Sequence, residues 1–300
     1  MKILLLGKDG QVGRALQPVL AAAGELIACG RAEADLEQVG ELPRLVAGHR
    51  PDIIVNAAAY TAVDQAETDA DRARLVNTEA VALLAAAAHR SGAWLVHYST
   101  DYVFDGTKPS PYTEADAPAP LSVYGATKSA GDHAITQSGC RHLIFRLSWV
   151  YAPRSNNFAR VMLRLARERT SINVVGDQIG APTSAALVAA ITATAIARAV
   201  GQPGGDALSG LYHLAPGGAV SRSDYAKFLI GEAHQQGARL QLSAAGVRPI
   251  ASSDYPTPAA RPLNSRLDTA KLCSSFALVL PPWQDEARRW VAETVAEGAY

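Results

Sequence analysis

Two side chains in this sequence have the types and the spacing that proton transfer requires. Tyr124 and Lys128 form a Tyr-x-x-x-Lys pattern within a segment of helical length, Ser122–Ser138. A spacing of four residues puts the phenol and the ammonium on one face of a helix, with their Cβ atoms about 5–6 Å apart. A free tyrosine has a pKa of about 10, and a neighbouring cation favours its ionised form. We therefore expect Tyr124 to act as a general acid, with Lys128 lowering its pKa.

A hydroxyl group stands where a substrate carbonyl would bind. Ser99 and Thr100 follow the apolar segment Trp94–Tyr98, and open α/β sheets bind their ligands at the carboxyl ends of the strands. Thr100 is expected to donate a hydrogen bond to the substrate oxygen as negative charge develops on it. The alternative interpretation is that Thr100 only caps the strand.

A glycine-rich turn near the start of the chain predicts a dinucleotide site. Gly7, Gly10 and Gly13 lie between a candidate strand, Lys2–Leu6, and a candidate helix, Gln11–Ala23. Gly7 permits the tight turn, Gly10 lets the backbone approach a pyrophosphate, and Gly13 lets the helix pack against the strand. The free N–H groups and the positive dipole end of such a helix favour phosphate binding.

The residues after the second candidate strand indicate which dinucleotide is bound. NAD-selective sites usually carry a carboxylate there, which binds the ribose 2′-hydroxyl. This sequence has Gly30 and Arg31 instead, and a guanidinium suits a 2′-phosphate. We therefore predict NADPH as the preferred cofactor, with NADH as the alternative. If Arg31 is only a solvated surface charge, this preference has no basis.

The first half of the chain alternates short apolar runs with segments of helical length. This alternation predicts a parallel sheet covered by helices on both faces, which right-handed crossovers build into a doubly wound, Rossmann-type α/β fold. The candidate strands are Lys2–Leu6, Glu25–Cys29, Ile53–Asn56, Trp94–Tyr98 and Leu143–Ser148, and the candidate helices are Gln11–Ala23, Gln38–His49, Asp69–Ser91 and Ser122–Ser138.

The second half of the chain is less regular, with Pro/Gly-rich connections between its candidate helices. We assign residues 1–150 to the dinucleotide-binding domain, with room for a further strand of its sheet after residue 170. Residues 151–300 are assigned mainly to a smaller C-terminal substrate-binding lobe, which closes over the carboxyl ends of the strands. The helices expected there are Asn157–Glu168, Ala185–Val200, Ser221–Gln236 and Trp283–Glu297.

Composition excludes several functional classes. With 28 basic and 28 acidic residues, the balanced charge argues against a nucleic-acid or acidic-membrane partner. The N-terminal apolar run ends at Gly7 and is too short for a signal peptide or a membrane span, so we expect a cytoplasmic protein. Three cysteines without CxxC spacing predict reduced thiols and neither a disulfide nor a zinc site.

Taken together, the glycine turn, the Ser-Thr pair and the Tyr-x-x-x-Lys pattern resemble the extended short-chain dehydrogenase/reductase family. Within it, longer blocks are similar to the dTDP-4-dehydrorhamnose reductases. This resemblance implies reduction of the C4 ketone of a dTDP-linked keto-sugar, dTDP-4-dehydro-L-rhamnose, to dTDP-L-rhamnose. The blocks are NAAAYTAVD (56–64), HYSTDYVF (97–104), FRLSWVY (145–151), DQIGAPT (177–183) and YPTPAARPLNSR (255–266).

The resemblance also implies roles for matching residues. Lys128 would hold the nicotinamide ribose, and Trp149 would pack against the sugar, where an indole offers a stacking surface; the alternative for Trp149 is ordinary core. The other implied cofactor contacts are Gly10, Gln11 and Val12 at the pyrophosphate, Asp35 and Leu36 at the adenine, and Ala59, Tyr60, Thr61 and Tyr98 near the nicotinamide. On the substrate side they are Thr100 and Asp101 at the sugar and, as weaker candidates for the nucleotide half, Asn156, Asn157, Arg261 and Asn264, of which Arg261 suits a diphosphate.

Some questions stay open at the level of sequence. Some relatives are described as magnesium-dependent dimers, but no carboxylate cluster has metal-ligand spacing here, so we predict no metal site and allow Mg²⁺ a structural role at most. A monomer and a homodimer are both compatible with the sequence. A nucleotide-sugar epimerase of the same superfamily is one alternative function. A non-catalytic regulatory subunit is another, although this chain retains the full set of proton-transfer residues.

Overall fold

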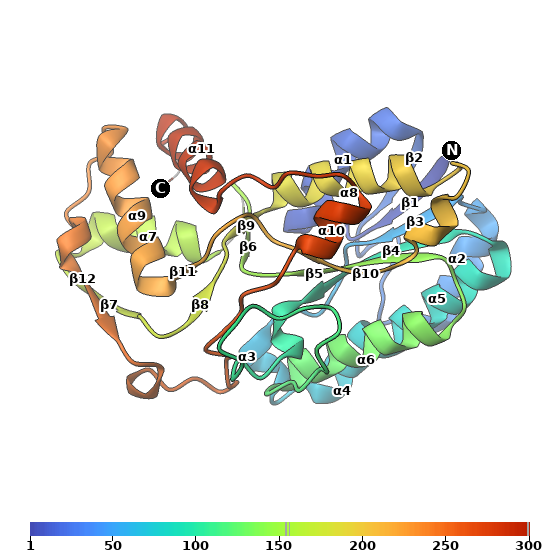
Figure 1. Ribbon diagram of the computed structural model, residues 1–300, viewed down its shortest axis with the longest axis horizontal. Coiled ribbons are helices and arrows are strands. Elements are labelled where there is room, and N and C mark those ends of the chain that lie inside the picture. The colour runs from blue at the N-terminus through green and yellow to red at the C-terminus, as the bar shows by residue number, and fades with distance from the viewer. Residues whose placement is uncertain (154, 156, 299) are drawn as a thin grey trace.

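The chain folds around a six-stranded sheet, seen in a computed structural model that describes residues 1–153, 155, 157–298 and 300 (Figure 1). Every neighbouring pair of strands in this sheet is parallel. The predicted doubly wound α/β fold is therefore confirmed. In spatial order the strands are β2 (Glu25–Cys29), β1 (Lys2–Leu6), β3 (Ile53–Asn56), β4 (Trp94–Thr100), β5 (His142–Leu147) and β10 (Gly210–Leu214).

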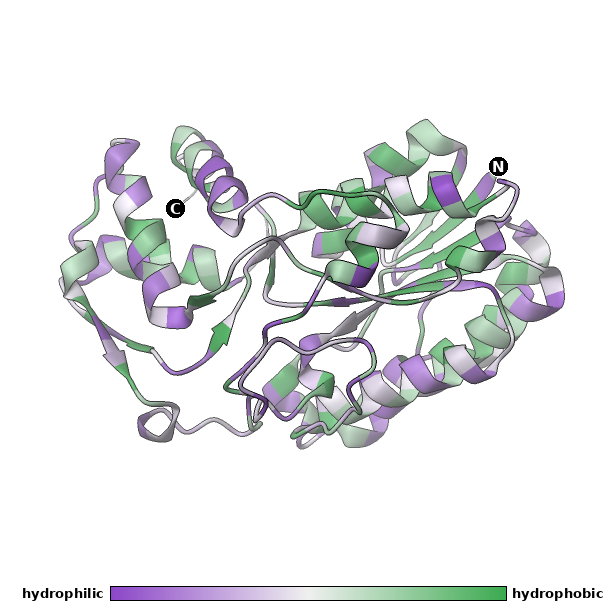
Figure 2. Cartoon of the chain, in the orientation of Figure 1, coloured by the Kyte–Doolittle hydropathy of each residue, from purple (hydrophilic) through white to green (hydrophobic). Residues whose placement is uncertain are grey.

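Helices cover both faces of the sheet because its side chains are apolar on both. On β1, Ile3 and Leu5 face one hydrophobic core, while Leu4 and Leu6 face the other. The first core is closed by α1 (Gln11–Ala23), α8 (Ala185–Ala199) and α10 (Ala270–Ser275), and the second by α2 (Leu42–His49), α5 (Ala80–Ser91) and α6 (Val123–Gln137). Figure 2 shows mostly hydrophobic strands between helices that carry both hydrophobic and hydrophilic residues, with α1 and α8 the more hydrophobic.

The strand order positions the functional site. It reverses direction between β1 and β3, and such a switch point leaves a crevice at the carboxyl ends of the strands, where ligands bind. The predicted bounds of the first three strands are those observed. Strand β4 runs two residues beyond its predicted end, to Thr100, so the Ser-Thr pair belongs to the strand itself.

Two helical segments differ from their predictions. The single helix expected over Asp69–Ser91 is α4 (Ala70–Arg74), a π-helical turn η2 (Leu75–Glu79) and α5. Within η2 the Asn77 side chain bonds both the N–H and the carbonyl of Tyr60, which holds the loop after β3. The segment expected over Gln38–His49 begins as a 3₁₀ turn, η1 (Val39–Glu41), and α3 (Val63–Ala66) was not expected.

The remaining elements form a second lobe with a core of its own, on the left of Figure 1. Its helices α7 (Phe158–Glu168), α9 (Arg222–Gln235) and α11 (Trp283–Ala296) pack with the strands β7 (Ile172–Val175) and β12 (Val247–Ile250). Short connecting elements complete the fold: β6 (Val150–Tyr151), β8 (Ile179–Gly180), β9 (Thr183–Ser184), β11 (Val220–Ser221), η3 (Asp101–Val103), η4 (Gly205–Leu208), η5 (Ala244–Gly246) and η6 (Ser252–Asp254).

Two further findings concern the described residues as a whole. Within them, no helix combines the length and the apolar character needed to cross a membrane. The three cysteines are unpaired; Cys29 and Cys140 are buried, and Cys273 is half-buried.

Candidate active site

The N-terminal turn of α6 holds Tyr124 against the end of β4. Ser122 caps the helix by accepting a hydrogen bond from the Gly125 N–H, and Glu67 accepts one from the Val123 N–H. Gly125 permits a close approach, because a Cβ there would lie 2.2 Å from the carbonyl oxygen of Tyr102. The helix can therefore bring Tyr124 to the end of the strand that carries Thr100.

The surroundings of Tyr124 favour the protonated form of its phenol. Burial raises the pKa of the Tyr124 phenol, and a hydrogen bond with Thr100 opposes this rise. We expected Lys128 to lower the pKa, but Lys128 is not among the groups that shift it, and desolvation of the phenolate is the main cause of the rise. A phenol that stays protonated at neutral pH is a proton donor, which is the role a reduction requires. The Thr100 hydroxyl also accepts from the Tyr102 N–H and so caps η3.

Lys128 is fully buried one helical turn beyond Tyr124. Its Nζ atom lies 2.7 Å from the Tyr98 carbonyl oxygen and 2.9 Å from Nε2 of His97. Burial lowers the pKa of Lys128 to about 8, against an opposing effect of Asp132. One position around Nζ thus faces the Tyr98 carbonyl, a second faces the His97 ring, and the third is left for a ligand.

The glycine turn has the shape that a pyrophosphate needs. Gly7 has a φ of 81°, and a Cβ there would lie 2.6 Å from the backbone of Ala58. A Cβ on Gly13 would lie 2.0 Å from the Gly7 carbonyl oxygen, so the helix packs directly on the turn. Helix α1 has no side-chain cap and no acidic residue in its first turn. The N–H groups at Gln11 and Val12 therefore suit an anion.

The end of β2 carries more charge than the sequence suggested. Arg31 pairs with Asp35 at 3.3 Å and with Glu37. Lys8 pairs with Glu33 at 2.7 Å, and Glu33 also accepts a hydrogen bond from the Gly30 N–H. Lys8 is therefore a second cation at this corner, and sequence analysis missed it. The pairing leaves Arg31 only partly available to a phosphate.

The other predicted cofactor residues have mixed environments. The Leu36 side chain is buried in the hydrophobic core, so only the backbone of Leu36 is left to contact a cofactor. The phenol of Tyr60 donates to Asp69, and its loop neighbours Ala59 and Thr61 are half-buried and exposed. The phenol of Tyr98 bonds Thr192 inside the core.

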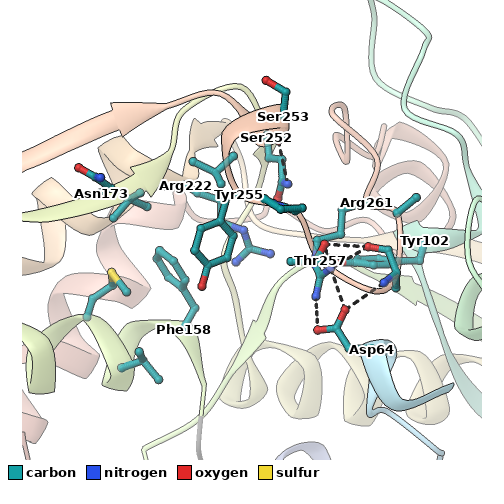
Figure 3. A pocket seen from close by; sticks show the side chains of 18 of the residues that line it. Asp64, Tyr102, Phe158, Asn173, Arg222, Ser252, Ser253, Tyr255, Thr257 and Arg261 are labelled. Carbon is teal, nitrogen blue, oxygen red and sulfur yellow. Dashed lines mark hydrogen bonds and ion pairs between the residues drawn. The ribbon is translucent and has the colours of Figure 1, made fainter. Parts of the chain in front are cut away.

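A large cavity lies beside this cluster, between the sheet and the second lobe. Its volume is about 820 Å³, within the range of pockets for ligands larger than a simple metabolite. Figure 3 shows its labelled side chains pointing inward from both sides of the cleft. The lining residues include Asp64 and Tyr102 from the sheet side, Phe158 from α7, Asn173 from β7, Arg222 from α9, and Tyr255 and Arg261 from the segment after η6.

The two arginines of the cavity differ in their partners. The Arg261 guanidinium forms a two-pronged pair with Asp64, at 3.0 and 2.7 Å, and also donates to the Ala259 carbonyl (Figure 3). The Arg222 guanidinium makes no hydrogen bond or ion pair with any residue that the structure describes. It stacks on the rings of Trp149, 3.7 Å from the centroid, and Phe158, 5.1 Å away.

Trp149 and Asp101 both lie near Arg222, which lines the cavity. Trp149 adopts a φ of 45°, which is rare for a bulky residue, and its indole is flanked by Arg222 and Gly180. One ring face expected to stack on a sugar is thus covered by Arg222. Burial raises the pKa of Asp101 to about 6, and its Oδ2 has no hydrogen-bond partner among the described residues.

The asparagines expected near the nucleotide serve the fold instead. Asn157 caps α7 through Oδ1 and donates from Nδ2 to the Ala152 carbonyl. Asn264 donates to the carbonyls of Lys108 and Ser110. Their amides are fully used by these bonds. Asn156 lies outside the described residues.

No metal site is visible in the part of the chain that the structure describes: no three His, Cys, Asp or Glu side chains gather there as metal ligands would. The arrangement that is visible is that of a proton donor, a buried lysine and a hydroxyl beside a dinucleotide turn. Such a group can reduce a ketone together with a hydride source, and the glycine turn suits the dinucleotide that would supply one.

Comparisons with known proteins show the family to which the chain belongs. A family model described as RmlD substrate binding domain matches residues 1–296. The dTDP-4-dehydrorhamnose reductase of Salmonella typhimurium is 48% identical over 98% of each chain, and that of Escherichia coli K12 is 49% identical with the same coverage. The crystal structure of dTDP-4-dehydrorhamnose reductase from Bacillus anthracis in complex with NADP aligns with a TM-score of 0.88 at 33% identity, over 98% of this chain and 99% of that chain.

The fold, the glycine turn and the Tyr-Lys pair define a Rossmann-type, nicotinamide-dependent oxidoreductase. Within that class, the chain belongs to the dTDP-4-dehydrorhamnose reductase family. A Thermus thermophilus UDP-glucose 4-epimerase in complex with NAD aligns with a TM-score of 0.79 but only 20% identity, so it shares the fold alone.

Proposed function

We propose that this chain reduces the C4 ketone of dTDP-4-dehydro-L-rhamnose to give dTDP-L-rhamnose, the last step of dTDP-rhamnose synthesis. The observation that carries the proposal is the hydrogen bond between the Tyr124 phenol and Thr100 at the end of β4, one helical turn from the buried Lys128. Identity of 48% and 49% to reductases of that name supports this substrate over that of an epimerase.

The residues of the chain supply the proton and the orientation for this reaction. When bound, the reduced nicotinamide supplies a hydride to the sugar C4. Tyr124 donates its phenolic proton to the oxygen on that carbon, so one hydride and one proton are added in total. Thr100 steadies the oxygen while charge develops on it, and Lys128 holds the nicotinamide ribose with its remaining donor.

The cofactor we propose is NADPH, with weaker use of NADH. Arg31 and Lys8 are two cations at the end of β2 and the start of the glycine turn, where a 2′-phosphate would lie. Both are paired with carboxylates, so the phosphate must compete with Glu33, Asp35 and Glu37 for them. We therefore expect a moderate preference and not an absolute one.

On the substrate side we propose a different arginine from the one that the sequence favoured. A guanidinium that is desolvated and unpaired toward described residues favours an anionic ligand. Arg222 meets this condition, whereas Arg261 is already neutralised by Asp64. We propose that Arg222 binds the diphosphate, that Asp101 accepts a hydrogen bond from a sugar hydroxyl, and that Trp149 supports both.

One experiment tests the reaction and its closest alternative together. Purified protein is mixed with NADPH and the keto-sugar, and loss of reduced-nicotinamide absorbance is compared with product identified by NMR. We expect one NADPH consumed per sugar reduced and a product with rhamnose stereochemistry at C4. An epimerase would convert sugar without net consumption, and a regulatory subunit would bind cofactor without any turnover.

The proposed setting is the cytoplasm, where NADPH and nucleotide sugars are available, and the product would serve O-antigen and lipopolysaccharide synthesis. The proposed partner is the dTDP-linked keto-sugar itself. Gel filtration with light scattering would distinguish a monomer from a homodimer.

A further inference from the structure

A series of buried, hydrogen-bonded polar side chains connects Lys128 to the interior of the sheet. His97 on β4 is fully buried, with Nε2 facing Lys128 at 2.9 Å. Its other ring nitrogen, Nδ1, lies 3.3 Å from the side-chain Nδ2 of Asn56 on β3. Each of the two residues follows three apolar residues of its strand at a buried position, where an uncompensated polar group is costly.

The orientation of Asn56 determines which ring nitrogen of His97 carries the proton. The Oδ1 atom of Asn56 accepts a hydrogen bond from the Ala58 N–H at 3.2 Å. A backbone N–H can only donate, so the atom facing it is the oxygen, and the amide NH₂ must face His97. Nδ1 of His97 is then an acceptor. Because burial keeps the ring neutral by lowering its pKa well below the usual value, its single proton is on Nε2.

This tautomer places an N–H donor against Lys128. An ammonium group has three donors and no lone pair, so it cannot accept from Nε2–H, whereas a neutral amine can. The contact at 2.9 Å is therefore satisfied when Lys128 is uncharged. A charged Lys128 would need the proton on Nδ1, and Nδ1–H would then face the NH₂ of Asn56.

We propose that His97, oriented by Asn56, is a positioning residue that sets the charge of Lys128 by donating a hydrogen bond from Nε2–H to its amine. The inference goes beyond the proposed reduction, although its kinetic test uses that reaction. The consequence for catalysis is that the proportion of enzyme with a charged Lys128 depends on two residues that touch neither substrate nor cofactor.

Several other ionisable or polar groups lie around Lys128 and bear on its charge. On α6 itself, Tyr124 is neutral and Asp132 opposes loss of the lysine charge. From β5, Arg146 is already paired with Asp132 at 3.1 Å. From η3, Asp101 lies nearer to Tyr124, and η2 presents the neutral Asn77 to α6. Burial already lowers the pKa of Lys128 to about 8, so a neutral amine is accessible near physiological pH.

The first test needs no turnover. Nitrogen-15 NMR of uniformly labelled wild-type protein distinguishes the two neutral tautomers of each of its seven histidines, and His97 is assigned as the signal that His97→Gln removes. We expect the Nε2–H tautomer at a pH of about 9, above the Lys128 pKa of about 8, where the lysine is largely uncharged. The Nδ1–H tautomer at that pH, or a protonated ring, would overturn the proposal whether or not the protein reduces a keto-sugar.

The second test measures the pH dependence of kcat/KM in the same variant. In His97→Gln the side-chain oxygen can accept from the ammonium, so the charged form gains a partner and the high-pH fall in activity should move up by about one pH unit. His142→Gln, at a half-buried position on β5 away from Lys128, is the matched control and should not move it. A fall that moves to lower pH, or loss of activity with an unmoved profile, would show that His97 has only a structural role.

Discussion

The two walls of the cleft are built on different physical principles. On the sheet side, Tyr124 and Lys128 stand on one regular helix, the first half-buried and the second fully buried, and their pKa values are shifted mainly by desolvation. On the lobe side, Arg261 is held by an ion pair with a half-exposed carboxylate, and Arg222 is held by aromatic stacking. The sheet side is therefore suited to proton transfer, and the lobe side to binding a charged group of the ligand that does not change during the reaction.

The largest effect should come from the sheet side, with Tyr124→Phe. Removing the hydroxyl removes the proton donor but keeps the ring, so kcat should fall by about 10²–10⁴ while NADPH binding, followed by fluorescence titration, stays unchanged. Tyr212→Phe is the matched control, because this buried tyrosine donates to the Leu208 carbonyl away from the cleft. Near-full activity in Tyr124→Phe would show that Tyr124 on the sheet side is not the proton donor.

The next effect should appear on the lobe side as a change in KM rather than kcat. Arg222→Gln loses a charge that meets the diphosphate, and such a charged hydrogen bond is worth about 1.5–3 kcal/mol, or about 10- to 100-fold in KM for the keto-sugar. Arg261→Gln should raise KM less, because Arg261 is already occupied by Asp64. The reverse ranking would restore Arg261 as the diphosphate ligand.

These two walls also differ in how well sequence predicted them. The Tyr124–Lys128 relation is local, since four residues on a helix fix it, and the position of Thr100 follows from a strand whose end is marked by polar residues. The partner of Arg261 is 197 residues away, at Asp64. Nothing in a single sequence signals a pair at that separation, so sequence analysis assigned Arg261 to the ligand and did not consider Arg222.

Some of the missed features did leave a signal. His97 and Asn56 are polar residues that each follow three apolar residues of a strand, which is a sign of a buried hydrogen-bond network. Asn157 follows the pattern of a helix cap, being a polar residue just before an apolar-periodic segment, and its amide indeed accepts from the Arg160 N–H. The pairing of charges near Arg31 was harder to predict from the sequence, because Lys8 and Glu33 come together only when the chain folds.

A smaller effect, on cofactor preference, is expected at the end of β2. There Arg31, like Arg261 on the lobe side, is already paired with a carboxylate, and it is exposed. In Arg31→Ala the ratio of kcat/KM for NADPH to that for NADH should fall by about two- to fivefold, since an exposed ion pair contributes about 1 kcal/mol or less. Arg44→Ala, an exposed arginine at 3.4 Å from Glu41, serves as the control and should leave the ratio unchanged. A wild-type preference for NADH would contradict the assignment of Arg31.

The smallest effect should be on stability, from the pair that joins the two walls. Arg261 holds the pKa of Asp64 below its usual value, and the Asp64 side chain is 44% exposed, so solvent screens the pair. Asp64→Asn should therefore cost about 0.5–1 kcal/mol, seen as a small fall in the midpoint of thermal unfolding.

The sign of the pH dependence follows from that lowered pKa. A carboxylate with a depressed folded-state pKa adds stability above its unfolded pKa of about 3.9, and the contribution is lost as pH falls through the folded value. The difference between wild type and Asp64→Asn should thus be constant near neutral pH and shrink in acid. Asp206→Asn, which breaks the more exposed pair with Arg141, should have the smaller effect. A loss that persists unchanged in acid would mean that Asp64 joins the walls through its shape and hydrogen bonds, and not through its charge.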